Sequence, residues 1–265
     1  MFLLASGFAI AKRMERTLLY YDVDKLAFKR LKPIVSAFPR TVEKFVVRYF
    51  NHSAKYLVLE TNCGQNARFF EDILPEIREM YQFSDKVREQ FAHLAECEKR
   101  NITCIHTRQT DFIRLNRTTD LEETVMAAYN ISEQHVRNIR IFKKEIVSLL
   151  SNAKTYLQSS QQYLIFGDDR TFMAKLATRL KQKTYISSHR EIEDMYLSSQ
   201  LCTSFLISSA MSTFGWWLAF FAPNQHSVYY MNDKRPNYSM EGIPREEMFL
   251  ENAFMMDDMP LCTSS

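Results

Sequence analysis

Apolar residues in the second half of the chain form short runs, and longer amphipathic stretches separate these runs. The short runs are typical of buried strands, and they lie at residues 102–106, 163–166, 184–187, 205–208 and 228–231. In the stretches between them apolar residues recur three and four positions apart, a spacing that predicts helices. Strands that alternate with helices of ten to fifteen residues predict right-handed crossovers and therefore a parallel sheet.

Capping residues indicate where the expected helices begin. The run from Thr119 to Glu122 has the sequence of a capping box, and Ser132 and Thr171 can begin the next two helices. We expect separate helices from residue 119 onward, at 132–149, 172–181 and 191–201, and from about residue 212 onward.

The first half of the chain is less regular. A helix is expected at residues 2–16, strands at 17–21 and 55–60, and further helices at 69–81 and from 85 onward. Pro33 and Pro39 indicate a loop-rich stretch, Pro75 predicts a kink or a break in its helix, and Ser84 can cap the helix that follows. We therefore expect an α/β fold in three parts, which are residues 1–98, the regular residues 99–233, and an extended, poorly packed tail at 234–265.

The composition is that of a soluble globular protein, with 46% apolar and 25% charged residues. A net charge of +3 gives no indication of a nucleic-acid surface. The chain has five glycines and neither a P-loop nor a GxGxxG pattern, which argues against a glycine-rich phosphate cradle. Its five cysteines lack the spacing of a zinc site, and their odd number leaves at least one thiol unpaired within the chain.

Targeting signals are weak. Five N-glycosylation sequons, which begin at Asn51, Asn101, Asn116, Asn130 and Asn237, suggest passage through the secretory pathway. No signal peptide is recognised, because the basic residues follow the apolar residues 2–11 instead of preceding them. Residues 201–222 carry no formal charge, but six Ser and Thr residues and Gly215 interrupt them. We expect a buried strand, a turn and a helix start there, not a membrane span.

Ionisable and hydroxyl residues directly follow three of the expected strands. These residues are His106, Arg108 and Asp111 after the first, Asp168 and Asp169 after the second, and Ser208, Ser209, Ser212 and Thr213 after the third. The carboxyl ends of parallel strands meet at one edge of a sheet, where open α/β sheets bind ligands, so these groups should lie near one crevice. A helix start at Ser212 offers N–H groups beside the positive end of the helix dipole, and the Arg108 fork fits phosphate oxygens. Together they would hold a diphosphate without a metal ion.

Each group also has an ordinary structural interpretation. Arg108 can be half of a surface ion pair, and Asp168–Asp169 can be a turn with a helix cap or a pair of magnesium ligands. Ser212–Thr213 can be a plain helix cap, and His106 can be a buried core histidine. The aromatic run at 214–221 is typical of a core helix, with a sugar platform as the alternative. The residues taken singly leave these alternatives open.

Three motifs carry a resemblance to a known family. The segments "IHTRQTDF", "LIFGDDRTFM" and "SAMSTFGWWLAF" resemble the successive motifs of the family 11 glycosyltransferases, the α-1,2-fucosyltransferases. That family shows a His-x-Arg-Arg-x-Asp strand end, a strand that ends in Asp-Asp, and a Ser-Thr-Phe-Gly/Ser-Trp-Trp helix start. The match runs in order over residues 102–230, and "FFEDILPEIREMYQF" before it is similar to the nematode branch.

The resemblance implies a GT-B architecture, in which two Rossmann-like domains face each other and the second holds most of GDP-fucose. It implies transfer of fucose to a galactose hydroxyl of a glycan, with inversion and with neither a metal nor a cofactor. Arg108 would neutralise the β-phosphate as GDP leaves, and it is the catalytic residue that the resemblance implies. The expected nucleotide-sugar contacts are His106, Arg108, Asp111, Asp168, Asp169, Ser212, Thr213 and Phe214, among which Asp168 and Asp169 shape the pocket rim.

Two departures from the family pattern support an alternative. Gln109 stands where the family usually has a second arginine, and the chain begins within the family's first motif, at Met1 and Phe2. The resemblance therefore implies an incomplete N-terminal domain and, upstream of Met1, a type II membrane anchor that would place the protein in the Golgi. The alternative is a non-catalytic relative that binds a nucleotide or a glycan, or a truncated remnant.

Overall fold

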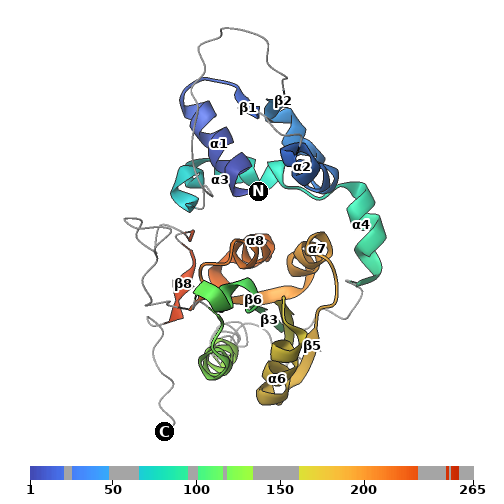
Figure 1. Cartoon of the computed structure of the whole chain (residues 1–265), viewed down its shortest axis with the longest axis vertical. Coiled ribbons are helices and arrows are strands. Elements are labelled where there is room, and N and C mark those ends of the chain that lie inside the picture. The colour runs from blue at the N-terminus through green and yellow to red at the C-terminus, as the bar shows by residue number, and fades with distance from the viewer. Residues whose placement is uncertain are drawn as a thin grey trace, which may run out of the picture. The chain divides into compact units, whose positions relative to one another are not determined.

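The computed structural model describes residues 1–20, 26–47, 66–94, 101–115, 118–133, 161–231, 249–250 and 252–256. The chain folds as two compact units, one built mainly on residues 1–91 and the other mainly on residues 92–237 (Figure 1). Within the described ranges, no helix has both the length and the apolar character that crossing a membrane requires.

The first unit contains two short parallel strands and several helices. Its elements are α1 (Phe2–Arg13), β1 (Leu18–Tyr20), α2 (Leu26–Ala37), η1 (Pro39–Glu43), β2 (Phe45–Val47), η2 (Ala67–Phe69), η3 (Glu71–Ile73), α3 (Leu74–Met80) and α4 (Asp85–Phe91), with η4 (Ala92–Leu94) directly after them. β1 pairs with β2 in parallel. Leu4 of α1 and Leu31 of α2 form the centre of a small apolar cluster.

In this unit the structural expectation drawn from Pro33 was wrong, and the one drawn from Pro75 was correct. The stretch around Pro33 is not a loop but the interior of α2, because Leu31 of that helix is buried against α1 and this packing outweighs the lost backbone hydrogen bond. Pro75 does divide its segment, since η3 ends at Ile73 and α3 begins at Leu74, so that Pro75 lies in the first turn, where its missing N–H costs nothing.

Other expectations for the first unit have mixed outcomes. Ser84 caps α4 as expected, accepting a hydrogen bond from the Val87 backbone at 3.3 Å. The first helix ends at Arg13, earlier than expected, and the chain reverses through Glu15, whose φ is 52°. The strand expected at 55–60 lies outside the described residues.

The second unit contains a six-stranded parallel sheet in the order β5-β4-β3-β6-β7-β8. Its strands are β3 (Ile102–Thr107), β4 (Gln162–Gly167), β5 (Lys183–Ile186), β6 (Cys202–Ile207), β7 (Val228–Tyr230) and β8 (Phe254–Met255), and its helical elements are η5 (Asp111–Leu115), residues 121–133, α6 (Arg170–Leu180), α7 (Glu191–Leu201), α8 (Thr213–Phe221) and η7 (Gln225–Ser227). The expected α/β class with a parallel sheet is confirmed. Phe254 and Met255, which lie in the region expected to be an extended tail, add a short edge strand.

The strand order creates a switch point beside the central strand. From β3 the chain proceeds outward through β4 and β5, and then returns through α7 to β6 on the other side of β3. The helix at 121–133 and α6 cover one face of the sheet, and α7 and α8 cover the other (Figure 1). Open parallel sheets bind ligands beyond the carboxyl ends of the two strands at such a point, here β3 and β6.

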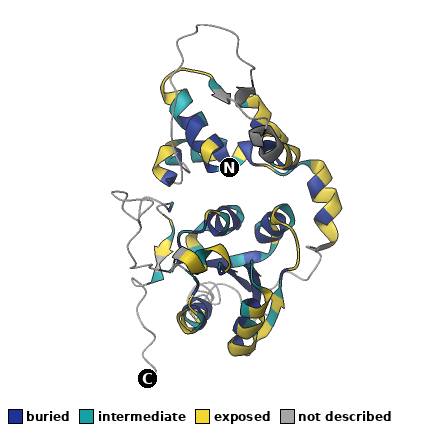
Figure 2. Ribbon diagram, viewed as in Figure 1, coloured by how far each residue is buried: buried dark blue, intermediate teal, exposed yellow. Residues whose placement is uncertain are grey.

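Successive side chains of the central strands point to opposite faces of the sheet. Ile105, Ile165 and Leu206 pack with the helix at 121–133 and α6. Their neighbours point the other way, where the Phe166 and Phe205 rings stack with centroids 6.2 Å apart. Figure 2 shows the central strands β3, β4 and β6 buried between the two helical layers. The side chain that follows Ile105, His106, therefore points toward α8.

A disulfide links the two strands that flank the switch point. Cys104 of β3 and Cys202 of β6 are both fully buried, their Cα atoms are 5.4 Å apart, and 98 positions separate them in the sequence. Cys63, Cys97 and Cys262 lie outside the described residues.

Three expected helix caps were wrong, and one of them is Thr171, since α6 begins at Arg170 and its cap is Asp169. The helix at 121–133 begins after Asp120, whose side chain accepts a hydrogen bond from the Glu123 backbone at 2.9 Å, so Thr119 does not cap it. Ser132 lies inside the same helix and does not begin a new one. Its hydroxyl contacts the Ala128 carbonyl and the Tyr163 hydroxyl, a back-bond that a helix interior accommodates.

Candidate functional site

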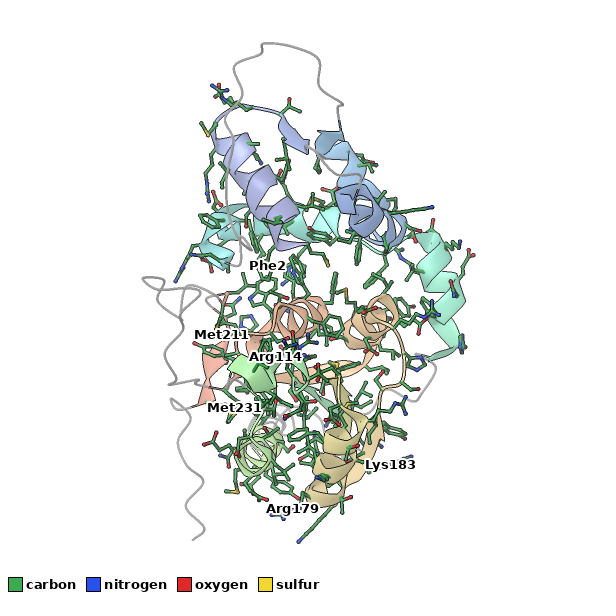
Figure 3. The ribbon with its side chains drawn as sticks, viewed as in Figure 1. Phe2, Arg114, Arg179, Lys183, Met211 and Met231 are labelled. Atoms are coloured by element: carbon green, nitrogen blue, oxygen red, sulfur yellow. A yellow bond between two sulfur atoms is a disulfide. The ribbon has the colours of Figure 1, made fainter. Side chains whose placement is uncertain are left out.

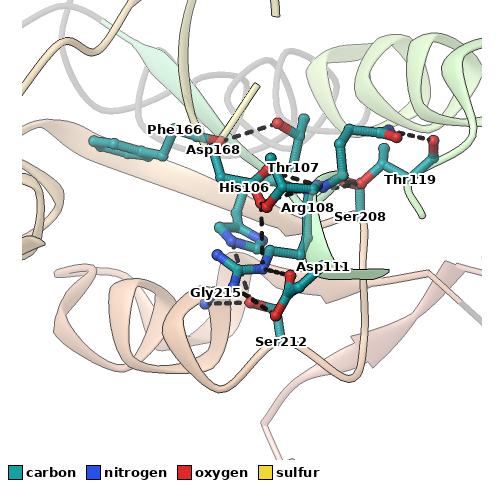
Figure 4. Close-up of polar contacts among 12 residues, drawn as sticks. His106, Thr107, Arg108, Asp111, Thr119, Phe166, Asp168, Ser208, Ser212 and Gly215 are labelled. Atoms are coloured by element: carbon teal, nitrogen blue, oxygen red, sulfur yellow. Dashed lines mark hydrogen bonds and ion pairs between the residues drawn. The ribbon is translucent and has the colours of Figure 1, made fainter. Parts of the chain in front are cut away.

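The three polar strand ends do meet at one edge of the sheet. β3 lies between β4 and β6, so His106 and Arg108, Asp168 and Ser212 come together although 106 positions separate His106 from Ser212 (Figure 4). The expected convergence is confirmed for these residues. The cluster lies at the switch point.

Arg108 is held by two carboxylates. Its Nε lies 2.9 Å from Asp111 Oδ1, and its Nη2 donates to Asp111 Oδ2 at 3.0 Å. Nε also lies 3.4 Å from Asp168 Oδ2, and the guanidinium carbon is 5.6 Å from the centre of the Phe112 ring. The ion-pair interpretation of Arg108 is therefore confirmed. The pair is not sealed in the interior, because the side chain of Asp111 is 54% exposed and that of Arg108 is 29% exposed.

Asp168 holds the loop that follows β3. Its Oδ1 accepts from the Gln109 backbone at 2.8 Å. Its Oδ2 accepts from the Thr110 backbone at 3.2 Å and from the Thr110 hydroxyl at 2.5 Å. Burial by itself would raise the pKa of Asp168, but the Thr110 hydroxyl, the backbone N–H groups and the Arg108 charge together hold that pKa below its usual value. Asp168 is therefore a carboxylate at neutral pH.

Gln109, which replaces an arginine of the family pattern, points into the interior. Its side-chain amide donates to the Thr119 carbonyl at 2.8 Å, and the residue is 9% exposed. It therefore stabilises the loop and supplies no positive charge at the edge of the sheet.

His106 packs against the start of α8. It is 1% exposed, its Nε2 lies 3.3 Å from the Ser212 hydroxyl, and its Nδ1 is buried without a hydrogen-bond partner among the described residues. Burial, assisted by the Arg108 charge, lowers the pKa of His106 to about 3, so the ring is neutral at physiological pH. The alternative interpretation of His106 as a buried core histidine is confirmed for its burial, although Nδ1 has no hydrogen-bond partner in the part of the chain that the structure describes.

The start of α8 offers one buried and one exposed hydroxyl. Ser212 is the N-cap, since its hydroxyl accepts from the Gly215 backbone at 3.3 Å, and it is 3% exposed. Thr213 is exposed and Phe214 is partly buried, with its ring centre 6.0 Å from that of His106. The cap interpretation of Ser212 is confirmed, and Thr213 is the hydroxyl that a ligand can reach.

Asp169 serves as the cap of the next helix. Its side chain caps α6 by accepting from the Thr171 and Phe172 backbones at 2.8 and 3.0 Å. No group of three or more His, Cys, Asp or Glu side chains that could hold a metal ion occurs among the residues the structure describes.

Two functional-looking threonines were missed by the sequence reasoning. Thr119 accepts from the Arg108 backbone at 3.0 Å and meets the Ser208 hydroxyl at 3.0 Å, and Thr110 contacts Asp168. Thr110 stands only two positions after Arg108, which was a usable signal. Thr119 carried none, because its sequence context predicted a helix cap instead.

Curated proteins provide a second line of observation. No protein-family model matches the chain. It is 25% identical over 267 residues to a Caenorhabditis elegans protein named "Putative galactoside 2-alpha-L-fucosyltransferase", a match that covers 88% of this chain and 68% of that protein. It is 24% identical over 180 residues to a galactoside 2-alpha-L-fucosyltransferase of the same nematode, covering 67% of this chain and 46% of the relative. The chain is a homologue of these fucosyltransferases. It spans between about half and two thirds of their lengths.

Solved structures give a weaker likeness. The fucosyltransferase NodZ from Bradyrhizobium has a TM-score of 0.48 at 14% identity, over 84% of this chain and 88% of that one. A crystal of the NodZ α-1,6-fucosyltransferase grown with GDP gives 0.47 at 16% identity, with the same coverage. At this level the likeness says nothing about what the present chain binds.

Proposed function

We propose that this chain is the donor-binding part of a fucosyltransferase that transfers L-fucose from GDP-fucose to a galactose hydroxyl of a glycan. The transfer forms an α-1,2 linkage, inverts the anomeric carbon and needs no metal ion. The homology with nematode galactoside 2-alpha-L-fucosyltransferases supports the reaction class. The observation that carries the proposal lies at the switch point of a parallel sheet, where Arg108 follows the central strand β3 and His106 of that strand contacts Ser212 at the start of α8.

Arg108 has the role that matters most for the chemistry. Negative charge builds up on the diphosphate while its bond to fucose lengthens, so a fixed guanidinium helps the transition state more than the ground state. Its contact with Asp111 is partly exposed, and exposed ion pairs contribute only about 0–1 kcal/mol. A phosphate oxygen can therefore replace Asp111 on the guanidinium at little cost.

The other residues of the site would complete the donor pocket. Thr213 and the first N–H groups of α8 would receive phosphate oxygens, and Phe214 borders the same helix start. His106 would remain neutral and support the helix start. Asp168 and Asp169 would hold the loops at the rim through their backbone contacts.

The disulfide and the glycosylation sequons bear on the compartment in which the protein would act. A buried disulfide persists in an oxidising environment, and five sequons occur in the chain. We propose the lumen of the Golgi as the place of action.

Substitution of Arg108 tests the proposal. Calorimetry with GDP and GDP-fucose should show binding by the wild type, and Arg108→Ala should weaken it about tenfold to a hundredfold, since a charge-assisted hydrogen bond is lost. Transfer to a galactose-containing glycan should fall about 10²- to 10³-fold and should survive EDTA. The proposal fails if the wild type binds neither nucleotide, or if the variant transfers fucose at a near-normal rate.

Arg179→Ala is the matched control for this substitution. Arg179 is also an arginine paired with a carboxylate, at 2.5 Å from Glu122, but it belongs to the last turn of α6. Figure 3 shows it at the far end of the unit from Arg114 of η5. Its replacement should leave nucleotide binding unchanged.

The inward position of Gln109 favours a second candidate, a non-catalytic relative that binds the nucleotide or a glycan. A missing second arginine lowers the positive charge beside the diphosphate. Binding of GDP-fucose without either transfer or hydrolysis would favour this candidate over the enzyme.

A further inference from the structure

Polar groups of three consecutive residues converge on the carboxylate of Asp168. The Gln109 backbone N–H and the backbone N–H and hydroxyl of Thr110 donate hydrogen bonds to it, and Arg108 Nε lies 3.4 Å away as an ion-pair partner. Asp168 directly follows β4, whereas all of these groups follow β3. The carboxylate therefore joins two neighbouring strand ends and fixes the first residues after β3.

A second contact holds the same loop one residue earlier. The Arg108 backbone N–H donates to the Thr119 hydroxyl at 3.0 Å, and the Thr119 backbone N–H donates to the Arg108 carbonyl at 3.1 Å. Thr119 thus fixes the backbone of Arg108, and Asp168 fixes the two residues after it. The direction in which the chain turns into η5 is set by Asp168.

The two carboxylates near Arg108 differ in their surroundings. Asp111 is 54% exposed and grips the guanidinium through Nε and Nη2. Asp168 is 17% exposed and makes most of its contacts with the loop backbone and with Thr110. An exposed partner can be exchanged for a ligand oxygen, but a carboxylate that holds two backbone N–H groups must stay in place.

We propose that Asp168 is a positioning residue, which clamps residues 109 and 110 and thereby holds the Arg108 guanidinium at the carboxyl edge of the sheet. The inference rests on the proposed function, because it assigns to Arg108 a diphosphate-containing ligand. It separates the roles of the two acids, since Asp168 acts through Arg108 and Asp111 is the partner that the ligand replaces.

Amide hydrogen exchange by NMR, together with calorimetry using GDP, tests this inference on the full chain. In Asp168→Ala the Gln109 and Thr110 amides should exchange at least about tenfold faster, because each loses a bond to a charged acceptor, and the dissociation constant of GDP should rise about tenfold. In Asp168→Asn one oxygen remains for Gln109, while an N–H2 group faces Thr110. The Thr110 amide should then exchange faster and the Gln109 amide should stay protected.

Glu122→Gln is the control, because Glu122 is an exposed acid paired with Arg179 in the same unit, and it should change neither quantity. Where transfer is measured, Asp168→Asn should lower kcat more than it raises the KM for the donor, by up to about a hundredfold, because a displaced guanidinium affects the transition state first.

The outcomes separate this inference from the proposed function. Wild-type protein that binds no GDP overturns the proposed function, and the assignment to Asp168 falls with it. Wild-type binding with unchanged exchange of the two amides in either Asp168 variant overturns the inference alone. Faster exchange with unchanged GDP affinity also overturns it, since the clamp would then be structural only. Thermal unfolding shows whether each variant is folded. If Asp168→Ala does not fold, the measurements on Asp168→Asn decide the outcome.

Discussion

The imidazole ring of His106 lies against the backbone of Gly215, so closely that a Cβ atom at position 215 would come within 2.5 Å of Nδ1. His106 belongs to the central strand β3, and Gly215 belongs to the first turn of α8. On its other nitrogen the ring meets the Ser212 hydroxyl at 3.3 Å. The ring thereby sets the position at which α8 begins relative to the end of β3.

Replacement of Gly215 by alanine should destabilise the protein despite the higher helix propensity of alanine. The added methyl group meets three atoms of a buried ring, and overpacking of this kind costs about 1–3 kcal/mol. The change in the free energy of unfolding can be measured with urea. In a His106→Ala background the same substitution should cost much less.

Gly7→Ala provides the comparison for that measurement. Gly7 also lies inside a helix, so it shares the gain in helix propensity of about 1 kcal/mol, but its added methyl group would meet only the flexible end of Leu18, at 3.0 Å. Equal costs at positions 7 and 215 would show that the ring contact is unimportant.

His106 should stay neutral between pH 5 and pH 8. Burial, with help from the Arg108 charge, lowers its pKa to about 3, against 6.5 in the unfolded chain. Between these values the unfolded state binds the extra proton, so the contribution of His106 to stability is full above pH 6.5 and declines as the pH falls toward 3. His106→Gln removes this slope, which urea unfolding at pH 7.5 and pH 5 would detect. An imidazole resonance of His106 that titrates near pH 6.5 would contradict the prediction.

The strands of the second unit were predictable because their apolar runs are short and amphipathic helical stretches separate them. The helix at 191–201 was predicted to the residue. The loop expected around Pro33 was wrong, because the tertiary packing of Leu31 outweighs the helix-breaking effect of the proline.

The candidate site was predictable in its location but not in its contacts. Parallel strands bring His106, Arg108 and Ser212 to one edge whatever the loops do. The clamp made by Asp168 depends on the backbone path of residues 109 and 110, and no residue pattern encodes that path. The pairing of Cys104 with Cys202 likewise required the strand order, because β3 and β6 become neighbours only after a crossover.

Removal of the disulfide should destabilise the second unit strongly. It closes a loop of about a hundred residues, for which the loss of chain entropy in the unfolded state predicts about 4–5 kcal/mol. Cys104→Ala and Cys202→Ala should each lose most of this amount, and the double variant should lose little more, because the same bond is broken in all three. Additive losses in urea unfolding would instead indicate ordinary truncation of two separate core side chains, as would free thiols at both positions in a peptide map of the native protein.

Asp194 should give the opposite pH dependence to His106. It is 6% exposed and accepts a hydrogen bond from the Ser187 hydroxyl, and burial raises its pKa to about 7, with Glu193 and Glu191 adding to the effect and Ser187 opposing it. The folded state therefore binds the extra proton between pH 3.8 and pH 7, so the contribution of Asp194 to stability is full below pH 3.8 and declines as the pH rises toward 7 and above. Asp194→Asn cannot ionise, so its stability relative to the wild type should increase from pH 5 to pH 8 in urea unfolding.

Asp120→Asn, a change at an exposed helix cap, is the control and should show a constant difference in stability from the wild type. A constant difference for Asp194→Asn as well would mean that the buried carboxyl group does not titrate in this range.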